Sequence, residues 1–502
     1  MRNFEKNVAK MLAFCILLVL FLHLAGSCAQ DSSGTTNTPE APLQNETAAG
    51  DDSPEEAGEM GLPPGLSSAD MGGKEITLGL LNWHNYDPLT IRDVEVEELT
   101  GEAFNDAAYN RNKFMEDTFN CVIKTIAYPT QDSIPGIRNQ IKAGDDTLDI
   151  VFFRAITTLP LLTGGYLHDL SDIPYVDLDK PWWNKSSIDD MTLGGRVYSL
   201  LGDHTMTVLS CVWLTYFNKQ LVADLALENP YALVREGKWT FDKMYEMGKI
   251  AAADMDGNGK RDENDRWGFM HIDNSAAALY NGFGEKLVSI GADGLPYISL
   301  ANESAMEKYM HITEILSDHD VFLNAHRRTP NAYDYEAGMF VWGRSLFSLG
   351  GVYYGPEMRE MEQDFGLLPY PKYNESQEWF NPIHSAAIPL ITVPVTNTDL
   401  DNMGLFIEAF TYQGHISLRP QFYDVLLQRK VARDNESEEM LNFIFDNICF
   451  DIGEAYDFGG IYGQFNSTAC SGNMNIASWL EKSTPKIERD IESFVEAMLG
   501  VE

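Results

Sequence analysis

Between residues 75 and 153 the chain alternates strand-like and helix-like segments, and this alternation limits the possible folds more than any other feature. The strand-like runs are EITLGLLN (75–82), CVIKTI (121–126) and LDIVFF (148–153), and helix-like stretches cover about 102–119 and 134–143. This order predicts an α/β lobe with a largely parallel sheet. Ligands of such sheets bind beyond the carboxyl ends of the strands. Trp83, His84, Phe153 and Arg154 follow the first and third strands and are therefore candidate ligand contacts.

The rest of the chain is too long for that one lobe. With 502 residues and 44% hydrophobic residues, the protein exceeds what one core usually fills, so we expect two lobes. A polar bend at 202–205 precedes a second apolar run at 208–217. Thr240 is a predicted helix N-cap, and residues 477–497 form an amphipathic helical segment that Pro485 should kink or restart. No internal repeat is visible.

The first 73 residues are not expected to belong to the folded body. Residues 1–27 have a basic start, an apolar run at 11–22 and small residues directly before Cys28, as in a bacterial lipoprotein signal peptide. Cys28 would then be acylated and become the mature N-terminus. An ordinary signal peptide that contains a Cys is the alternative. Residues 28–73 are rich in Ser, Thr, Gly, Pro and acidic residues, which predicts a disordered tether.

The charge and the cysteines exclude some classes of function. The formal net charge of −39 is spread along the chain, so we expect no nucleic acid partner. Four cysteines remain after Cys28, and they show no CxxC or CxxH spacing: Cys121, Cys211, Cys449 and Cys470. Free buried thiols are the expected state, rather than a metal site or a disulfide framework.

Several segments resemble the carbohydrate-type extracellular solute-binding proteins of ABC importers, especially the long lipoproteins of Gram-positive bacteria. The resemblance rests on the order and spacing of AGDDTLDIVFF (143–153), GGYLHDLSDI (164–173), GGRVYSLLGDHTMTVLSCVWLTYFNKQL (194–221), GKWTFDKM (237–244), GRSLFSLGGVYY (343–354), DFGLLPYPKY (364–373) and VLLQRKVARDNESEEMLNFIF (425–445). It implies an α/β, two-lobe periplasmic-binding-protein-like fold with a ligand cleft between interleaved lobes. Lobe I would take 74–200 and 345–395, and lobe II 201–344 and 396–502.

The same resemblance implies a function. The protein would be a monomer anchored by lipid to the outer face of the cell membrane. It would bind a sugar or oligosaccharide, without chemistry, and deliver it to the permease subunits of an importer.

A sugar site needs aromatic faces and planar polar groups. By resemblance, Trp83, His84, Phe153 and Arg154 face the cleft, together with Tyr353 and Tyr354 after the Gly350–Gly351 pair; Asp203 and His204 lie at the first crossing between the lobes. Arg154 and Asp203 would bind adjacent hydroxyls. Structural alternatives stay open. A Trp side chain belongs to the hydrophobic core more often than it forms a stacking surface for a ligand, and Arg154, Asp203 or His204 could have purely structural partners. Trp182 and Trp183 are expected in surface packing and Trp213 in the core.

Residues 254–265 fit the twelve-position calcium loop. The proposed ligands are Asp254, Asp256, Asn258, the backbone carbonyl of Lys260, Asp262 and Asp265, with Gly259 at the sharp turn. Asp instead of Glu at the last position shortens that ligand. A strand-like run, not a second helix, follows at 266–270, so a structural Ca²⁺ is expected rather than a sensor. An empty acidic turn is the alternative.

Two other classes of function compete with transport. A glycan-active surface enzyme would need two carboxylates across a cleft, but no nucleophile elbow, HExxH, P-loop or GxGxxG stands in a supporting context. A calcium-stabilised surface interaction module would usually show repeats. Turnover of an oligosaccharide would distinguish the enzyme from the binding protein.

Overall fold

The computed structural model describes residues 60–81, 93–128, 133–358, 361–428 and 434–500. The expected signal peptide, Cys28 and residues 28–59 of the expected tether lie outside these residues. The tether prediction is wrong for residues 60–73, because Met71 is buried and its N–H donates to the Phe119 carbonyl at 2.8 Å. Within them, no helix has the length and apolar character needed to cross a bilayer.

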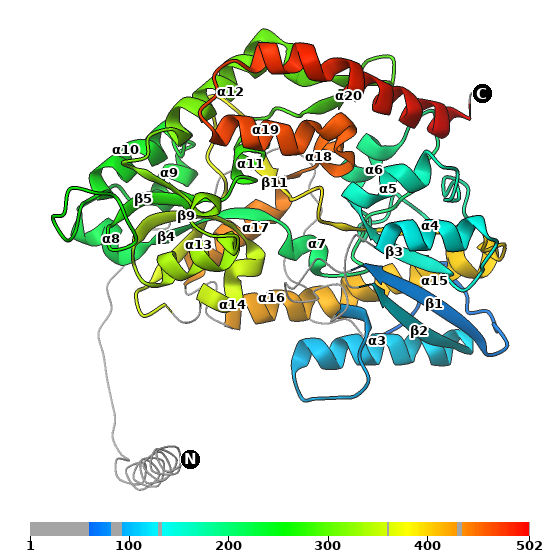
Figure 1. The fold of residues 1–502 in the computed structure, drawn as a ribbon. Helices are drawn as coiled ribbons and strands as arrows, with labels where there is room; N and C mark the ends of the chain where they lie inside the picture. The colour runs from blue at the N-terminus through cyan, green and yellow to red at the C-terminus, as the bar shows by residue number, and fades with distance from the viewer. Residues whose placement is uncertain (1–59, 82–92, 129–132, 359–360, 429–433, 501–502) are drawn as a thin grey trace, which may run out of the picture. The chain divides into compact units, whose positions relative to one another are not determined.

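The first sheet has the strand order β12-β3-β1-β2 (Figure 1). It contains β1 (Lys74–Leu81), β2 (Cys121–Tyr128), β3 (Ile150–Arg154) and β12 (Pro389–Thr392). β1 pairs parallel with β2 and β3, while β12 pairs antiparallel with β3. The connecting helices α3 (Ala103–Phe119) and α4 (Ile134–Lys142) confirm the predicted β-α-β-α-β order.

Both faces of the inner strands β1 and β3 are buried, which explains why these two strands read as nearly continuous apolar runs, whereas the edge strand β2 keeps exposed positions. Leu78 and Leu80 of β1 belong to the same core as α15 (Leu400–Gln413). Val151 and Phe153 of β3 belong to the second core, which includes Ile137 of α4.

The second sheet has the order β10-β4-β9-β5-β8. Its strands are β4 (Trp213–Asn218), β5 (Trp267–His271), β8 (Phe322–Asn324), β9 (Ser345–Gly351) and β10 (Phe365–Leu368). Every residue of β4, β5 and β9 is buried. β9 pairs antiparallel with β4 and parallel with β5.

This pairing differs from the expected chain trace. The resemblance gave residues 345–395 to lobe I, but β9 and β10 lie in the second sheet, and among the described residues of that segment only β12 joins the first. The physical reason is that β9 is hydrogen-bonded along both edges by strands of the second sheet, which fixes it at the centre of that sheet. The resemblance also gave residues 396–502 to lobe II, but α15 packs in the core of the first sheet.

Helices cover both sheets. Their bounds are α5 (Ala155–Leu162), α6 (Lys185–Met191), α7 (Thr207–Ser210), α8 (Lys219–Asp224), α9 (Pro230–Arg235), α10 (Phe241–Ala251), α11 (Ser275–Gly282), α12 (Glu303–Leu316), α13 (Ala332–Val341), α14 (Gly355–Met358), α16 (Arg419–Gln428), α17 (Asn435–Asp446), α18 (Ile452–Tyr456), α19 (Ile461–Cys470) and α20 (Ile476–Leu499). Thr240 caps α10 as predicted, because its side chain accepts from the Lys243 N–H. α20 runs through Pro485 as one helix, so the suggested restart is wrong, and the alternative of a kink at Pro485 stays a prediction.

Two tryptophan predictions have opposite outcomes. Trp213 is buried in the core, as expected. The expectation of surface packing for Trp182 and Trp183 is wrong, since both are buried. Their indole N–H groups donate to the two carboxylate oxygens of Glu408 on α15, at 3.2 and 3.1 Å, and this buried acceptor makes their burial possible. Cys121, Cys211, Cys449 and Cys470 are free, and all but Cys449 are buried.

Candidate functional site

The predicted ligand contacts fall into four groups. Trp83 and His84 lie outside the described residues. Phe153 and His204 are fully buried, and the His204 ring lies 4.7 Å from that of Phe152. Arg154, Tyr353 and Tyr354 lie at the ends of β3 and β9, whereas the carboxylate of Asp203 pairs with His415 and Arg419. Contact of these residues with a solute stays a prediction.

A cluster of aromatic and polar side chains lies between the two sheets. We call it the inter-sheet cluster, and it consists of Arg154, Asn274, Tyr333, Tyr353, His384 and Tyr462. These residues come from the end of β3, the start of α11, α13, the turn after β9, the segment between β11 (Asn381–Pro382) and β12, and α19. Six segments far apart in the sequence therefore contribute one side chain each.

Short contacts connect the members of the inter-sheet cluster. The Asn274 amide lies 3.4 Å from both the Tyr333 hydroxyl and His384 Nε2. His384 Nε2 in turn lies 3.1 Å from the Tyr462 hydroxyl. The ring of Tyr353 lies 6.0 Å from that of Tyr333. Arg154 is close enough to interact electrostatically with Tyr333 and Tyr462.

The glycine pair before Tyr353 explains how the tyrosines reach this position. A Cβ at Gly351 would lie 2.2 Å from the Tyr353 ring, and one at Gly350 would lie 2.3 Å from the Tyr354 ring. Both rings therefore fold back over the last residues of β9, where any larger residue would collide with them. Tyr354 is fixed further by Glu336 of α13, whose carboxyl accepts hydrogen bonds from the Tyr354 hydroxyl at 2.9 Å and from Ser348 at 2.8 Å.

Burial removes most formal charges from the inter-sheet cluster. Burial, together with Arg154, lowers the pKa of His384 to about 3, so its imidazole is neutral at physiological pH. Glu454 lies 3.8 Å from His384 Nε2, and burial raises the pKa of this carboxyl well above its ordinary value. Burial lowers the pKa of Arg154 only to about 10, so the guanidinium stays protonated. The cluster thus offers one cation, neutral donors and acceptors, and aromatic faces, a combination suited to binding a hydroxylated solute.

Sequence reasoning named Arg154 and Tyr353 but missed Asn274, Tyr333, His384 and Tyr462. Each of the missed residues is a single polar side chain in an irregular or helical segment, without a strand end to mark it. Only tertiary packing brings these four together.

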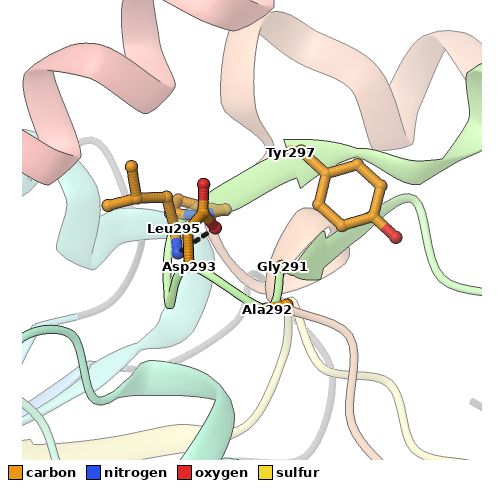
Figure 2. Close-up of a pocket in the computed structure, with 6 residues that line it drawn as sticks. Gly291, Ala292, Asp293, Leu295 and Tyr297 are labelled. Carbon is orange, nitrogen blue, oxygen red and sulfur yellow. Dashed lines mark hydrogen bonds between the residues drawn. The ribbon is translucent and has the colours of Figure 1, made fainter.

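A separate hollow lies at the hairpin of β6 (Val288–Ile290) and β7 (Pro296–Ile298). It has a volume of about 530 Å³ and is lined by residues 291–293 and 295–297. Figure 2 shows that Leu295 and Tyr297 project to different sides of this turn, and that Asp293 accepts a hydrogen bond from the Leu295 N–H. One turn supplies the whole lining, so no polar groups from separate elements converge there.

The predicted calcium loop connects α10 to β5, and the strand that follows it is the expected one. Carboxylate oxygens of Asp254, Asp256 and Asp265 lie within 4.8 Å of one another. Gly259 has a positive φ of 73°, which fits the sharp turn. Asp262 and Asn258 are also close, since the Asn258 amide donates to Asp262 Oδ2 at 3.3 Å. The donor set consists of hard oxygens, the ligands that Ca²⁺ prefers.

Comparison with solved structures identifies the fold. No family model and no curated protein matches the chain. Among solved structures, an ABC substrate-binding protein of Listeria monocytogenes in complex with cycloalternan aligns over 86% of this chain and 100% of its own, with 14% identity and a TM-score of 0.51.

Two further solved structures give the same result. The GacH receptor of Streptomyces glaucescens, solved unliganded and with acarbose, aligns over 86% of this chain and 99% of its own at 13% identity and a TM-score of 0.52. A cyclo/maltodextrin-binding protein with maltotetraose aligns over 85% and 97%, at 12% identity and a TM-score of 0.53. The chain therefore has the two-lobed α/β fold of these proteins, as the sequence predicted.

Proposed function

We propose that the protein is the extracellular solute-binding component of an ABC importer and that it binds a sugar or oligosaccharide without chemical conversion. The observation that carries this proposal is the inter-sheet cluster, in which aromatic rings and neutral hydrogen-bonding groups from six segments converge between the two sheets. The solved proteins of the same fold are described as bound to cycloalternan, acarbose and maltotetraose, which supports a carbohydrate. The working unit is a monomer.

A thermal-shift screen tests this proposal. A ligand that binds only the folded state at one hundred times its Kd stabilises that state by about 2.7 kcal/mol. With maltose, maltotetraose, cyclodextrin and acarbose as probes, we expect at least one sugar class to raise the Tm. Tyr353→Ala should abolish the shift, and Trp83→Ala tests the predicted contact outside the described residues.

Tyr297→Ala is the matched control, because this tyrosine is exposed on the β6–β7 hairpin and does not belong to the inter-sheet cluster. If Tyr353→Ala binds as well as the parent, the site is wrongly placed. Hydrolysis of any of the probes by the purified protein would favour the enzyme alternative.

We further propose that the protein is held at the outer face of the cell membrane by acylation of Cys28, with residues 28–59 as the tether, since Met71 already belongs to the folded body. The small residues before Cys28 and the apolar run before them support this proposal. Cys28→Ser should release the protein from the membrane fraction into the medium. Retention of this variant on membranes would contradict acylation at Cys28.

We also propose that residues 254–265 hold a structural Ca²⁺. The convergence of Asp254, Asp256 and Asp265 supports it, because clustered carboxylate oxygens are the hard ligands that Ca²⁺ prefers. A chelator should lower the Tm and added Ca²⁺ should restore it, whereas Asp254→Asn should remove that response. An identical Tm with chelator and with Ca²⁺ would overturn the proposal.

A further inference from the structure

The helix α11 begins inside the inter-sheet cluster. Its N-cap residue is Asn274, whose side chain contacts other members of the cluster and does not cap the helix. The N-terminal end of a helix carries a partial positive charge, which favours an anion nearby. The first N–H groups of α11 are bonded within the protein, since Ser275 donates to the Ile272 carbonyl at 3.1 Å and Ala277 donates to a side chain of α19. An anion at this end would therefore need side-chain donors in addition to the helix dipole.

A buried donor without an acceptor lies at the same helix end. Asn466 of α19 reaches the start of α11, because its Oδ1 accepts a hydrogen bond from the Ala277 N–H at 2.9 Å. That bond identifies the other terminal atom of the side chain as the amide nitrogen, Nδ2. Asn466 is only 3% exposed, and among the described residues Nδ2 has no hydrogen-bond partner. An unpaired donor in the interior is destabilising, so this amide needs an acceptor from outside the chain.

Asn466 belongs to the face of α19 that borders the inter-sheet cluster. It follows Tyr462 by four residues, and residues four apart lie on one face of a helix. The Tyr462 hydroxyl lies 3.1 Å from His384 Nε2, which places this face of α19 against the cluster. The buried hydroxyl of Tyr353 also lacks a partner among the described residues. Two donors from separate segments are thus available to a bound solute.

The charges around the cluster favour a negatively charged solute. Arg154 supplies a protonated guanidinium, because burial lowers its pKa only to about 10. Burial raises the pKa of Glu454 well above its ordinary value and that of Glu336 to about 8, so these two carboxyls are largely neutral at pH 7. A neutral carboxylic acid can itself donate a hydrogen bond. The carboxylate of Asp273, next to the start of α11, accepts from the Asn324 amide at 2.7 Å.

We propose that the solute of this protein is an acidic sugar whose carboxylate binds at the start of α11, with Asn466 and Arg154 as its donors. The proposal rests on the proposed function and names the chemical class of the solute. Arginine pairs with a carboxylate through two parallel hydrogen bonds, and the Asn466 amide gains the acceptor that it lacks. A sugar phosphate carries a charge of the same sign and is the second possible source of the anion.

Calorimetric titration of the full chain with matched acidic and neutral sugars tests this proposal. The acidic probes are galacturonate, glucuronate and digalacturonate, and each is compared with its methyl ester; glucose 6-phosphate is the phosphate probe. We expect one uronate to bind at least about tenfold more tightly than its ester, because the ester keeps the ring and hydroxyls but loses the charge-assisted hydrogen bonds.

The other results of this titration would overturn the proposal. Equal binding of acid and ester, or no binding of any acidic sugar, would show that the site does not select a carboxylate. The screen with neutral sugars decides the proposed function separately, so the two failures are distinguishable. Tighter binding of glucose 6-phosphate than of every uronate would identify a phosphate as the anion and would overturn the carboxylate.

Asn466→Asp tests the donor itself. Aspartate keeps an oxygen that can accept from the Ala277 N–H, and a negative charge is favourable at a helix N-terminus, so the variant should fold. It should weaken uronate binding by about tenfold or more and change ester binding much less.

Asn302→Asp is the matched control, because this exposed asparagine accepts from the Ala305 N–H at 2.8 Å at the start of α12. It should leave uronate binding unchanged. If Asn466→Asp does not fold, Asn466→Ala carries the test, since it removes the donor without adding a charge. Parent-like uronate affinity in the folded Asn466 variant would overturn the assignment of this residue.

Discussion

The buried carboxyl of Glu336 should make the protein less stable as the pH rises, and this effect can be isolated with Glu336→Gln. Glu336 is fully buried beneath Tyr354 and Ser348, whose hydroxyls both donate to it. Burial raises the pKa of this carboxyl from 4.5 to about 8. Glutamine has nearly the same shape but cannot ionise.

The sign of the effect follows from proton linkage. Below pH 4.5 the carboxyl is protonated in both the folded and the unfolded chain. Between pH 4.5 and about 8 the unfolded chain loses this proton while the folded protein keeps it. The free energy of unfolding therefore falls by about 1.4 kcal/mol for each pH unit in this window, a few kcal/mol in total. Glu336→Gln has no ionisable group at this position, so its free energy of unfolding should not fall in this way.

Urea denaturation of the parent and of Glu336→Gln at pH 5, 6, 7 and 8 measures the effect. At pH 5 we expect the variant to be less stable by about 1 kcal/mol, because the amide oxygen replaces only one of the two acceptors. By pH 8 the variant should be the more stable protein. Glu378→Gln, at an exposed position, is the matched control for the loss of one carboxylate. A constant stability difference between parent and Glu336→Gln from pH 5 to pH 8 would refute this reasoning.

Two more substitutions probe the buried polar groups that hold the first sheet and its helices together. Glu408→Ala removes the shared acceptor of the Trp182 and Trp183 indoles, and leaving two buried donors unpaired should lower the free energy of unfolding by about 2–5 kcal/mol in urea, with a shift of tryptophan fluorescence. A stability within 0.5 kcal/mol of the parent, a difference typical of surface changes, would contradict that role. Arg111→Met keeps much of the volume but takes the donor from the His204 carbonyl, so we expect a loss of about 3–5 kcal/mol by the same assay. Parent-like stability would mean that the crossing segment does not need this anchor.

Local sequence patterns predicted the elements of the first sheet well. The runs at 75–82, 121–126 and 148–153 correspond to β1, β2 and β3, and the helices between them begin and end within a residue or two of the expected positions. These elements carry strong apolar periodicity. The apolar run at 208–217 was less informative, because a short helix, α7, and the strand β4 share it.

Features that depend on distant partners could not be predicted. Trp182 and Trp183 look like surface residues in the sequence, because their acceptor Glu408 lies more than two hundred residues further along the chain and no local pattern indicates it. In the same way, nothing in the sequence links Asn274 to His384 or His384 to Tyr462. Asp203 was rightly placed at the crossing, but its partners His415 and Arg419 lie on a helix that the sequence did not connect to it.

The location of bound solute tests the account most directly. A crystal structure of the protein with the sugar that gives the largest thermal shift should show that sugar between the two sheets, within hydrogen-bonding distance of Arg154 or His384 and against the ring of Tyr353. A sugar bound elsewhere, such as at the hairpin of residues 291–297, with nothing between the sheets, would contradict it.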